Sequence, residues 1–289
     1  MKKTLLFAVI SFVLLVAMKP DKPAYQLFDH KGKKANYKDL LKAASNTDIV
    51  FFGELHNNPI CHWLQFELTR DLHLVKPDQI VMGAEMFESD NQLVLNEYLS
   101  GKVRERNFEQ EARLWNNYKT DYKPLVKYAL DNNIPFIATN VPRRYAAIVN
   151  RDGFEGLETL SPEALQLIAP LPIPYDPELK GYKDMVDMMA GAGGHATSNI
   201  AKAQALKDAT MAHFILQNRQ PGQLFIHYNG TYHTNNFEGI VWYIRQYNPE
   251  VKMLTIATVE QDSVKNLEDE NMGLADFILC VPSTMTKTY

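Results

Sequence analysis

Short apolar runs alternate along the chain with longer stretches in which apolar residues recur at helical spacing. The runs lie at residues 49–53, 80–84, 134–138, 223–226, 253–257 and 276–281. Uninterrupted apolar runs of this length are typical of strands that are buried on both faces. Strands that alternate with helices indicate a parallel sheet. The pattern predicts an α/β fold in which helices flank a mostly parallel central sheet.

The segment at about residues 151–197 differs from the rest of the chain. It contains five prolines, a methionine-rich stretch and a glycine-rich stretch that ends at His195. Structureless loops of this length are uncommon in compact domains. We therefore expect a helical insertion subdomain within one α/β domain that covers residues 24–289, and a long helix that begins after Ser198.

The first residues resemble an export signal. Lys2 and Lys3 precede an apolar stretch from Thr4 to Ala17, which is shorter than a comfortable membrane span. We expect a signal peptide at residues 1–17 and a protein that is periplasmic or associated with the envelope. An uncleaved N-terminal anchor is the alternative. No cysteine follows the stretch, so a bacterial lipid anchor at this point is excluded.

Composition narrows the class of function. The 289 residues are 46% hydrophobic and 22% charged, with a net charge of −4, as in ordinary globular proteins. Basic residues cluster only at Arg143 and Arg144, which argues against nucleic-acid binding. Of the two cysteines, Cys280 lies within an apolar run, and a buried free thiol is a better interpretation than a disulfide with Cys61.

Polar side chains follow four of the predicted strands at the point where each strand ends. The carboxyl ends of parallel strands share one edge of the sheet, where ligands bind in open α/β folds. We therefore expect these side chains to converge on a single pocket. They are Glu54 and His56, Glu85, Asn140 and Arg143, and His227, Asn229 and His233.

Two carboxylates and two imidazoles, from Glu54, His56, Glu85 and His233, suit Zn, Mn or Fe(II). In such a metal site Glu54 or Glu85 would be a ligand or general base, and His233 a ligand or proton shuttle. The alternative is structural, because glutamates at helix starts are favoured by the helix dipole.

Other histidines have simpler interpretations. We expect His227, inside a strand, to be a hydrogen-bonded core residue, and His62 to lie at a pocket rim or on the surface. The pattern G-x-x-H favours a joint site, because it follows an apolar run twice, at Gly53 to His56 and at Gly230 to His233.

Several motifs together resemble the ChaN-type haem-binding proteins, whose superfamily includes the TIKI and TraB proteins and the erythromycin esterases. The resemblance covers roughly residues 25–250, and its motifs agree in order and spacing. They are Gly53 to Pro59 with His62 and Gln65, Gly83 to Phe87, Trp115 through Tyr122 to Leu125, Asn140 to Arg143, Asp208 to Ala212, and Asn229-Gly230 with His233.

The resemblance implies an α/β core with a helical subdomain and a role in haem or iron acquisition at the bacterial envelope. The TIKI relatives imply instead a divalent-metal-dependent hydrolase of esters or peptides that uses the positions of Glu54, His56, Glu85 and His233. The chain departs from the family in two respects. It lacks the anchoring cysteine, and its second motif is spaced Asn-Gly-Thr-Tyr-His.

A haem-binding protein needs an apolar slot, an axial ligand and cations for the propionates. We expect the cations to be Arg143 and Arg144. The insertion offers Tyr175, Tyr182 and His195 as axial ligands, besides its methionines. A homodimer and peripheral association with the envelope both stay open.

Overall fold

The computed structural model describes residues 22–191 and 199–289 and is built around a sheet of eight strands. The strand order is β2-β1-β8-β7-β3-β6-β4-β5, and all neighbours from β8 to β5 are parallel. The short strands β1 and β2 add an antiparallel edge. The strands are β1 (Gln26–Asp29), β2 (Lys34–Ala35), β3 (Ile49–Glu54), β4 (Ile80–Glu88), β5 (Phe136–Asn140), β6 (Leu224–Gly230), β7 (Met253–Gln261) and β8 (Phe277–Pro282).

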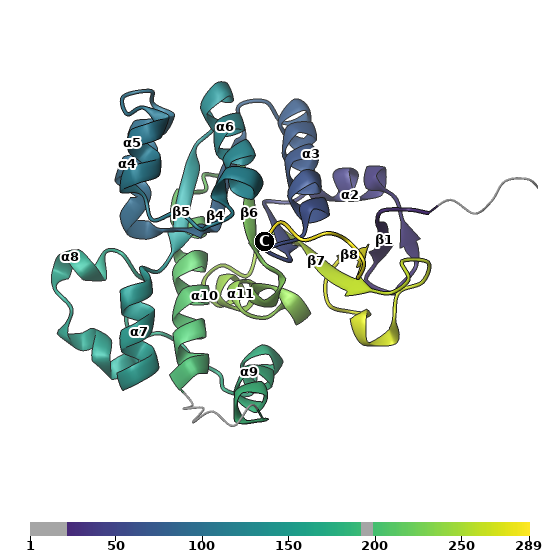
Figure 1. The fold of residues 1–289 in the computed structure, drawn as a ribbon. Helices are drawn as coiled ribbons and strands as arrows, with labels where there is room; N and C mark the ends of the chain where they lie inside the picture. Colours follow the sequence, from purple (N-terminus) through teal and green to yellow (C-terminus); the bar gives the residue numbers. More distant parts are fainter. Residues whose placement is uncertain (1–21, 192–198) are drawn as a thin grey trace, which may run out of the picture.

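Helices cover both faces of the sheet and make three layers (Figure 1). One layer contains α2 (Tyr37–Ala44), α3 (Pro59–Val75), α4 (Gln92–Leu99), α5 (Glu105–Glu111) and α6 (Lys123–Asn132). The other contains α7 (Arg143–Asp152), α8 (Pro162–Leu165), α9 (Lys180–Gly191), α10 (Asn199–Asn218) and α11 (Ile240–Tyr247). The predicted α/β class with a mostly parallel central sheet is confirmed.

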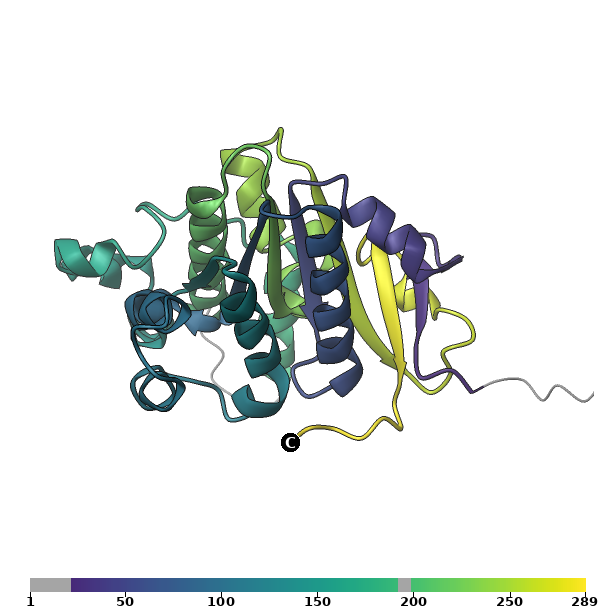
Figure 2. The ribbon, with the colours of Figure 1, turned by 90° about the horizontal axis from the view of Figure 1, so that it is seen from above.

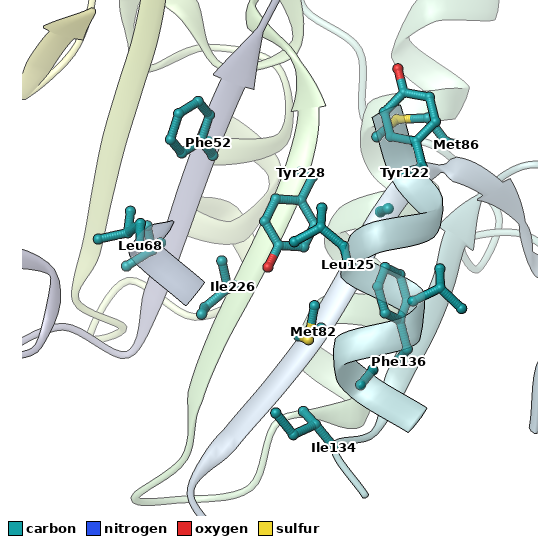
Figure 3. Packing of buried hydrophobic residues seen from close by; sticks show 14 of the residues in the cluster. Phe52, Leu68, Met82, Met86, Tyr122, Leu125, Ile134, Phe136, Ile226 and Tyr228 are labelled. Atoms are coloured by element: carbon teal, nitrogen blue, oxygen red, sulfur yellow. The ribbon is translucent and has the colours of Figure 1, made fainter. Parts of the chain in front are cut away.

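Alternate residues of each central strand face different helical layers. In β3, Val50 and Phe52 pack in the core beneath α3 and α6, whereas Ile49 and Phe51 pack in the core beside α10 and α11. In Figure 3, Phe52 and other buried sheet residues lie among the side chains of α3 and α6. Because side chains alternate along a strand, Glu54 belongs to the α3 and α6 side.

Some element boundaries differ from the sequence prediction. Strand β5 begins at Phe136 rather than Ile134, and β7 continues to Gln261, beyond the apolar run. Helix α5 was not predicted, because its residues are mostly charged. The insertion contains a 3-10 helix (Phe154–Thr159), α8 and α9. The predicted signal peptide at residues 1–17 and the helix start at Ser198 lie outside the described residues.

The carboxyl ends of the parallel strands form one edge of the molecule. Strand β8 ends at the lower side in Figure 2, and the chain continues from there to its C-terminus beneath the other strands. Within the described part of the chain, no helix is both long and apolar enough to cross a membrane.

Candidate functional site

The two G-x-x-H motifs lie side by side, because β3 and β6 are parallel neighbours in which Glu54 is paired with Gly230. A Cβ atom on Gly53 would lie 2.9 Å from the Cα of Thr231, in the second motif. A Cβ atom on Gly230 would lie 2.9 Å from the ring of His56, in the first. Each motif therefore needs its glycine to make room for the other motif.

Glu54 is buried and bonded on both of its oxygens. The hydroxyl of Tyr122 donates to Oε1 at 2.7 Å, and Nδ1 of His56 lies 2.9 Å from the same atom. The amide of Gln65 donates to Oε2, and the ring of His62 lies 3.7 Å away. Burial would lower the pKa of His56, but the bond to Glu54 and the nearby Glu85 outweigh it, and its pKa is raised.

Glu85 forms a second buried cluster on the other side of Gly230. Its Oε2 accepts the backbone N–H of Gly230 at 2.7 Å, and its Oε1 lies 3.2 Å from Nε2 of His233. The opposite ring nitrogen of His233 is bonded to Asp208, whose second oxygen accepts the hydroxyl of Tyr182 at 2.9 Å.

Charge pairing dominates this second cluster. Burial would lower the pKa of His233, but the carboxylates of Glu85 and Asp208 raise it to about 10. Burial would likewise raise the pKa of Glu85, but the facing ring of His233 holds it well below its usual range. Near neutral pH the pair is therefore an imidazolium and a carboxylate.

The four predicted site residues meet around Gly230. The position of its missing Cβ is 2.9 Å from the ring of His56 and 3.4 Å from Oε2 of Glu85. The two pairs approach from opposite faces, because Glu54 faces α3 and α6, whereas Glu85 faces His233, which is bonded to Asp208 on α10. Their roles as metal ligands or catalytic groups stay predictions.

A metal ion is poorly matched to this arrangement. Across residues 22–191 and 199–289, no group of three or more His, Cys, Asp and Glu side chains is arranged to hold a metal ion. Both oxygens of Glu54 instead accept hydrogen bonds from protein donors. One oxygen of Glu85 accepts the backbone N–H of Gly230, and the other faces His233. Metal binding by these residues stays a prediction.

Two neighbouring pockets open at this edge. The first, a cleft of about 490 Å³, is lined by Glu85, Glu88, Leu114, Trp115, Asn116, Asn117, Asn140, Val141, Arg143, Lys207 and Tyr289. The second, an apolar slot of about 430 Å³ between α7, α9 and α10, is lined by Ala146, Ala147, Asn150, Met185, Met188, Met189, Ile200, Ala203, Gln204 and Lys207. Both volumes fall in the range of roughly 300–1,000 Å³ that is common for small-molecule sites. Lys207 lies at the junction, since it lines both.

The predicted propionate partners are engaged by carboxylates. Nε of Arg143 donates to Glu88 at 2.5 Å, and Arg113 donates to the other oxygen of Glu88 at 3.0 Å. Arg144 donates to Asp90 at 2.5 Å. Binding of propionates by Arg143 and Arg144 stays a prediction, and it would have to compete with these ion pairs.

The predicted axial ligands have different surroundings. Tyr182 is 4% exposed, its hydroxyl is bonded to Asp208, and burial raises its pKa well above the usual value, so it stays a neutral donor. Tyr175 is half-buried and stacks on Tyr182, with ring centroids 5.7 Å apart. His195 lies outside the described residues. Ligation by Tyr182 would require its bond to Asp208 to break.

The other histidines are partly as expected. His227 is fully buried and bonded to Thr139 and Asn229, so its prediction as a satisfied core residue is confirmed. His62 lines a pocket on the α3 side, as expected of a rim residue. It is 7% exposed, so the surface alternative is wrong, because it packs between Glu54 and Asp121.

Several residues that build the site had no predicted role. Gln65, Tyr122 and Asp208 each bond to a predicted site residue. All three belong to the motifs that carry the family resemblance, so the resemblance could have identified them. Lys207 lies next to Asp208 and had no such signal.

The last residues of the chain reach the cleft. The backbone N–H of Thr288 donates to the carbonyl of Asn57 at 2.9 Å, and its hydroxyl donates to Asp121 at 2.8 Å. Tyr289 lines the cleft together with Glu85 and Trp115. Figure 1 places this end of the chain beside the central strands.

These features define an α/β protein with paired G-x-x-H motifs and two pockets at the carboxyl edge of its sheet. The chain matches the family described as "Haem-binding uptake, Tiki superfamily, ChaN" over residues 40–244. It belongs to this family.

Known proteins share parts of this sequence and fold. The solved structure of ChaN from Campylobacter jejuni, described as showing cofacial haem binding, has a TM-score of 0.66 at 16% identity, covering 88% of this chain and 96% of that one. A mutant of the erythromycin esterase EreC in its open conformation has a TM-score of 0.51 at 11% identity, covering 92% and 99%. At these identities the likeness shows the fold alone.

A curated relative is much longer. Protein RETICULATA-RELATED 5, chloroplastic, from Arabidopsis thaliana is 29% identical over an alignment of 133 residues, and the alignment covers 44% of this chain and 18% of that protein. The chain therefore spans about a fifth of the length of the curated relative that it matches.

Proposed function

We propose that this protein binds haem in the apolar slot between α7, α9 and α10. The family match supports haem as the ligand, and the observation that carries the location is the slot itself. Its walls are mostly methionine and alanine side chains together with Ile200, and Asn150, Gln204 and Lys207 complete the lining. Methionine adapts well to a flat apolar ligand. The slot opens beside the cleft that Glu85 lines, and Lys207 lines both.

The residues of the slot fit a porphyrin with anionic side chains. Met185, Met188 and Met189 offer apolar contact and thioether sulfurs, which are known haem ligands. Lys207 would pair with a propionate at the mouth of the slot, as a flexible point charge that no described carboxylate holds in an ion pair. When bound, haem supplies an iron centre. This chain's own residues enclose it, exclude water and anchor its charged edge.

A haemin titration tests this proposal. We expect a Soret band to develop with one-to-one stoichiometry, and Ala147→Trp to abolish it, because Ala147 is exposed and lines the slot. Lys207→Gln should weaken binding several-fold. Lys202→Gln on the same helix is the matched control and should bind like the wild type. Absence of a Soret shift in the wild type, or unchanged binding by Ala147→Trp, would contradict the proposal.

We also propose that the protein is exported and acts in haem or iron acquisition at the envelope. Support comes from the signal-like sequence at residues 1–17 and from the uptake role in the family description. Mass spectrometry of the protein recovered from a periplasmic fraction should give a mature N-terminus at Met18. Recovery from the cytoplasm with residues 1–17 intact would contradict export.

A second candidate function is hydrolysis of an ester or a peptide at the cleft. The observation that favours it is His56, whose side chain is 34% exposed while the Glu54 behind it is fully buried. A partly exposed histidine oriented by a buried carboxylate is the usual arrangement of a general base. If this hydrolysis depends on a divalent metal, the purified protein must contain that metal.

Two measurements separate these forms. His56→Asn should abolish hydrolysis of an ester or peptide substrate at an unchanged melting temperature. Elemental analysis after purification should find stoichiometric Mn, Zn or Fe only if the activity is metal-dependent. No turnover across ester and peptide libraries would remove this candidate.

A further inference from the structure

Helix α9 contributes to both the apolar slot and the sheet edge. Met185 and Met189 line the slot. Tyr182 lies three residues before Met185 and seven before Met189, and therefore on the same side of the helix. The Tyr182 side chain is buried, and its hydroxyl donates to Oδ2 of Asp208 at 2.9 Å. One helix thus connects the wall of the slot to a buried carboxylate of the site.

Asp208 connects Tyr182 to His233, because it is bonded to both. Its Oδ1 is bonded to Nδ1 of the His233 ring, and the opposite ring nitrogen lies 3.2 Å from Oε1 of Glu85. These three residues and Tyr182 are all buried, with exposed fractions between 1% and 6%. Buried polar groups must keep their partners, because water is not available to replace them. The ring of His233 is therefore held from both sides.

A second contact fixes α9 to the same segment of chain. The carboxylate of Glu238, five residues after His233, accepts the backbone N–H of Lys180 at 3.0 Å and that of Gly181 at 2.8 Å. These are the first two residues of α9, where helix N–H groups lack partners within the helix. The segment that carries the second motif thus holds α9 by its first turn.

His233 also has an alternative partner at the slot. The side-chain amide of Gln204, which also lines the slot, lies against the ring, with its nitrogen 3.1 Å from Nδ1 and 3.3 Å from Nε2. Once this amide turns over, its oxygen can accept an N–H of the imidazolium. If Asp208 loses the Tyr182 hydroxyl, one of its oxygens is left without a donor, and Asp208 can turn. The ring of His233 would then be free to rotate between Asp208, Glu85 and Gln204.

We propose that Tyr182 is a positioning residue that, through Asp208, fixes the His233 ring against Glu85 and makes this geometry depend on the position of α9. A ligand that enters the slot contacts α9 directly, so occupancy of the slot is transmitted to the second G-x-x-H motif. The transmission is a bond rearrangement of a few buried groups rather than a change of fold. It rests on the proposed function only for the identity of the ligand.

Ring ¹⁵N NMR of His233 tests the positioning without any ligand. The signals are assigned by their loss in His233→Asn. In Tyr182→Phe we expect a shift of both ring nitrogens beyond the line width, since the hydrogen bonds of the ring change. Tyr175→Phe, which removes a hydroxyl from the neighbouring stacked ring, is the matched control and should leave the signals in place. Unmoved signals in folded Tyr182→Phe would overturn the proposal.

A second variant guards against misfolding of the first. Glu238→Gln acts on α9 from a partly exposed position and should shift the same signals in the same direction, by a smaller amount. Glu178→Ala removes an exposed ion pair with Lys183 on the same helix and is its control. A shift in Glu178→Ala equal to that in Glu238→Gln would show general loosening and also overturn the proposal.

A porphyrin arm tests the link to the slot. Gallium protoporphyrin is diamagnetic, so the ¹⁵N signals of His233 remain observable. Saturation should move them in the wild type and move them less than half as far in Tyr182→Phe. If porphyrin binds and the wild-type signals stay in place, the coupling is wrong and the haem proposal stands. If no porphyrin binds, the haem proposal fails, and the ligand-free comparison decides the positioning role by itself.

Discussion

The ring of His56 lies directly against the α-carbon of Gly230 on the neighbouring strand. A methyl group there would come within 2.9 Å of both Cε1 and Nε2 of the ring. The first histidine of the site therefore depends on a residue of the second motif, about 175 positions later in the chain.

We expect Gly230→Ala to lower the free energy of unfolding by about 1–3 kcal/mol, because overpacking at a rigid position forces neighbours to shift. His56 would be pushed out of line with Glu54. Gly181→Ala is the control, because its Cβ would meet only Glu238 at 3.5 Å and it lies in a helix. Urea unfolding of both variants measures the difference, and a Gly230→Ala protein as stable as the wild type would contradict the geometry.

Two tyrosines of one short π-helical segment, Tyr118–Tyr122, should respond in opposite ways to loss of their hydroxyls. Tyr122→Phe removes a donor to buried Glu54 and should cost about 1.5–3 kcal/mol, the usual range for a hydrogen bond to a charged group. Tyr118→Phe should be neutral or stabilising, since its buried hydroxyl has no partner in the described part of the chain. Thermal or urea unfolding distinguishes them. Equal losses would mean that the bond to Glu54 contributes nothing.

The buried ring of His227 should make the free energy of unfolding fall at acidic pH. Burial lowers its pKa to about 4, so the folded protein keeps the ring neutral while the unfolded chain takes up a proton below a pKa of about 6.5. The unfolded state then binds more protons, and stability is lost as the pH falls from about 6.5 to 4. The loss attributable to His227 is about 3 kcal/mol at 1.36 kcal/mol per pKa unit.

The measurement compares urea unfolding of the wild type and His227→Gln at pH 7, 5.5 and 4. We expect the gap between the two proteins to narrow as the pH falls, because the variant has no ring to protonate. A gap that is constant with pH would show that His227 is not held neutral in the folded protein.

Arg143 and Lys207 should separate structural from ligand-binding roles. Arg143→Ala removes a charged hydrogen bond from buried Glu88, which keeps Arg113, and should cost about 1–3 kcal/mol of stability. Its effect on haemin affinity should be small. Lys207→Gln should leave stability within about 0.5 kcal/mol and weaken haemin binding. Weaker haemin binding by Arg143→Ala, with unchanged binding by Lys207→Gln, would favour Arg143 as the propionate partner, as predicted from the sequence.

The strands and their polar ends were predictable because central parallel strands carry uninterrupted apolar runs. The apolar runs at residues 49–53 and 80–84 lie in the strands Ile49–Glu54 and Ile80–Glu88, and each run is followed directly by a glutamate of the candidate site. Their order in space was not predictable. Strand β6 lies between β3 and β4, although it follows both in the chain by a long connection, and no local pattern encodes such a placement.

The supporting residues of the site were harder to identify. Asp208 sits among apolar residues of α10, and a single aspartate on a helix usually faces solvent. Only the fold shows that it is buried beside His233. Lys207 is one lysine among many, and its place at the junction of two pockets follows from how α7, α9 and α10 assemble.

The pleat of the sheet sends the first carboxylate to one helical layer and the second to the other. Glu54 relies on Gln65 and Tyr122, whereas Glu85 relies on His233 and, beyond it, Asp208. Evolution could therefore rebuild one half of the site for a new ligand while the chemistry of the opposite half persists. Divergence between relatives should then concentrate on one side of the sheet at a time.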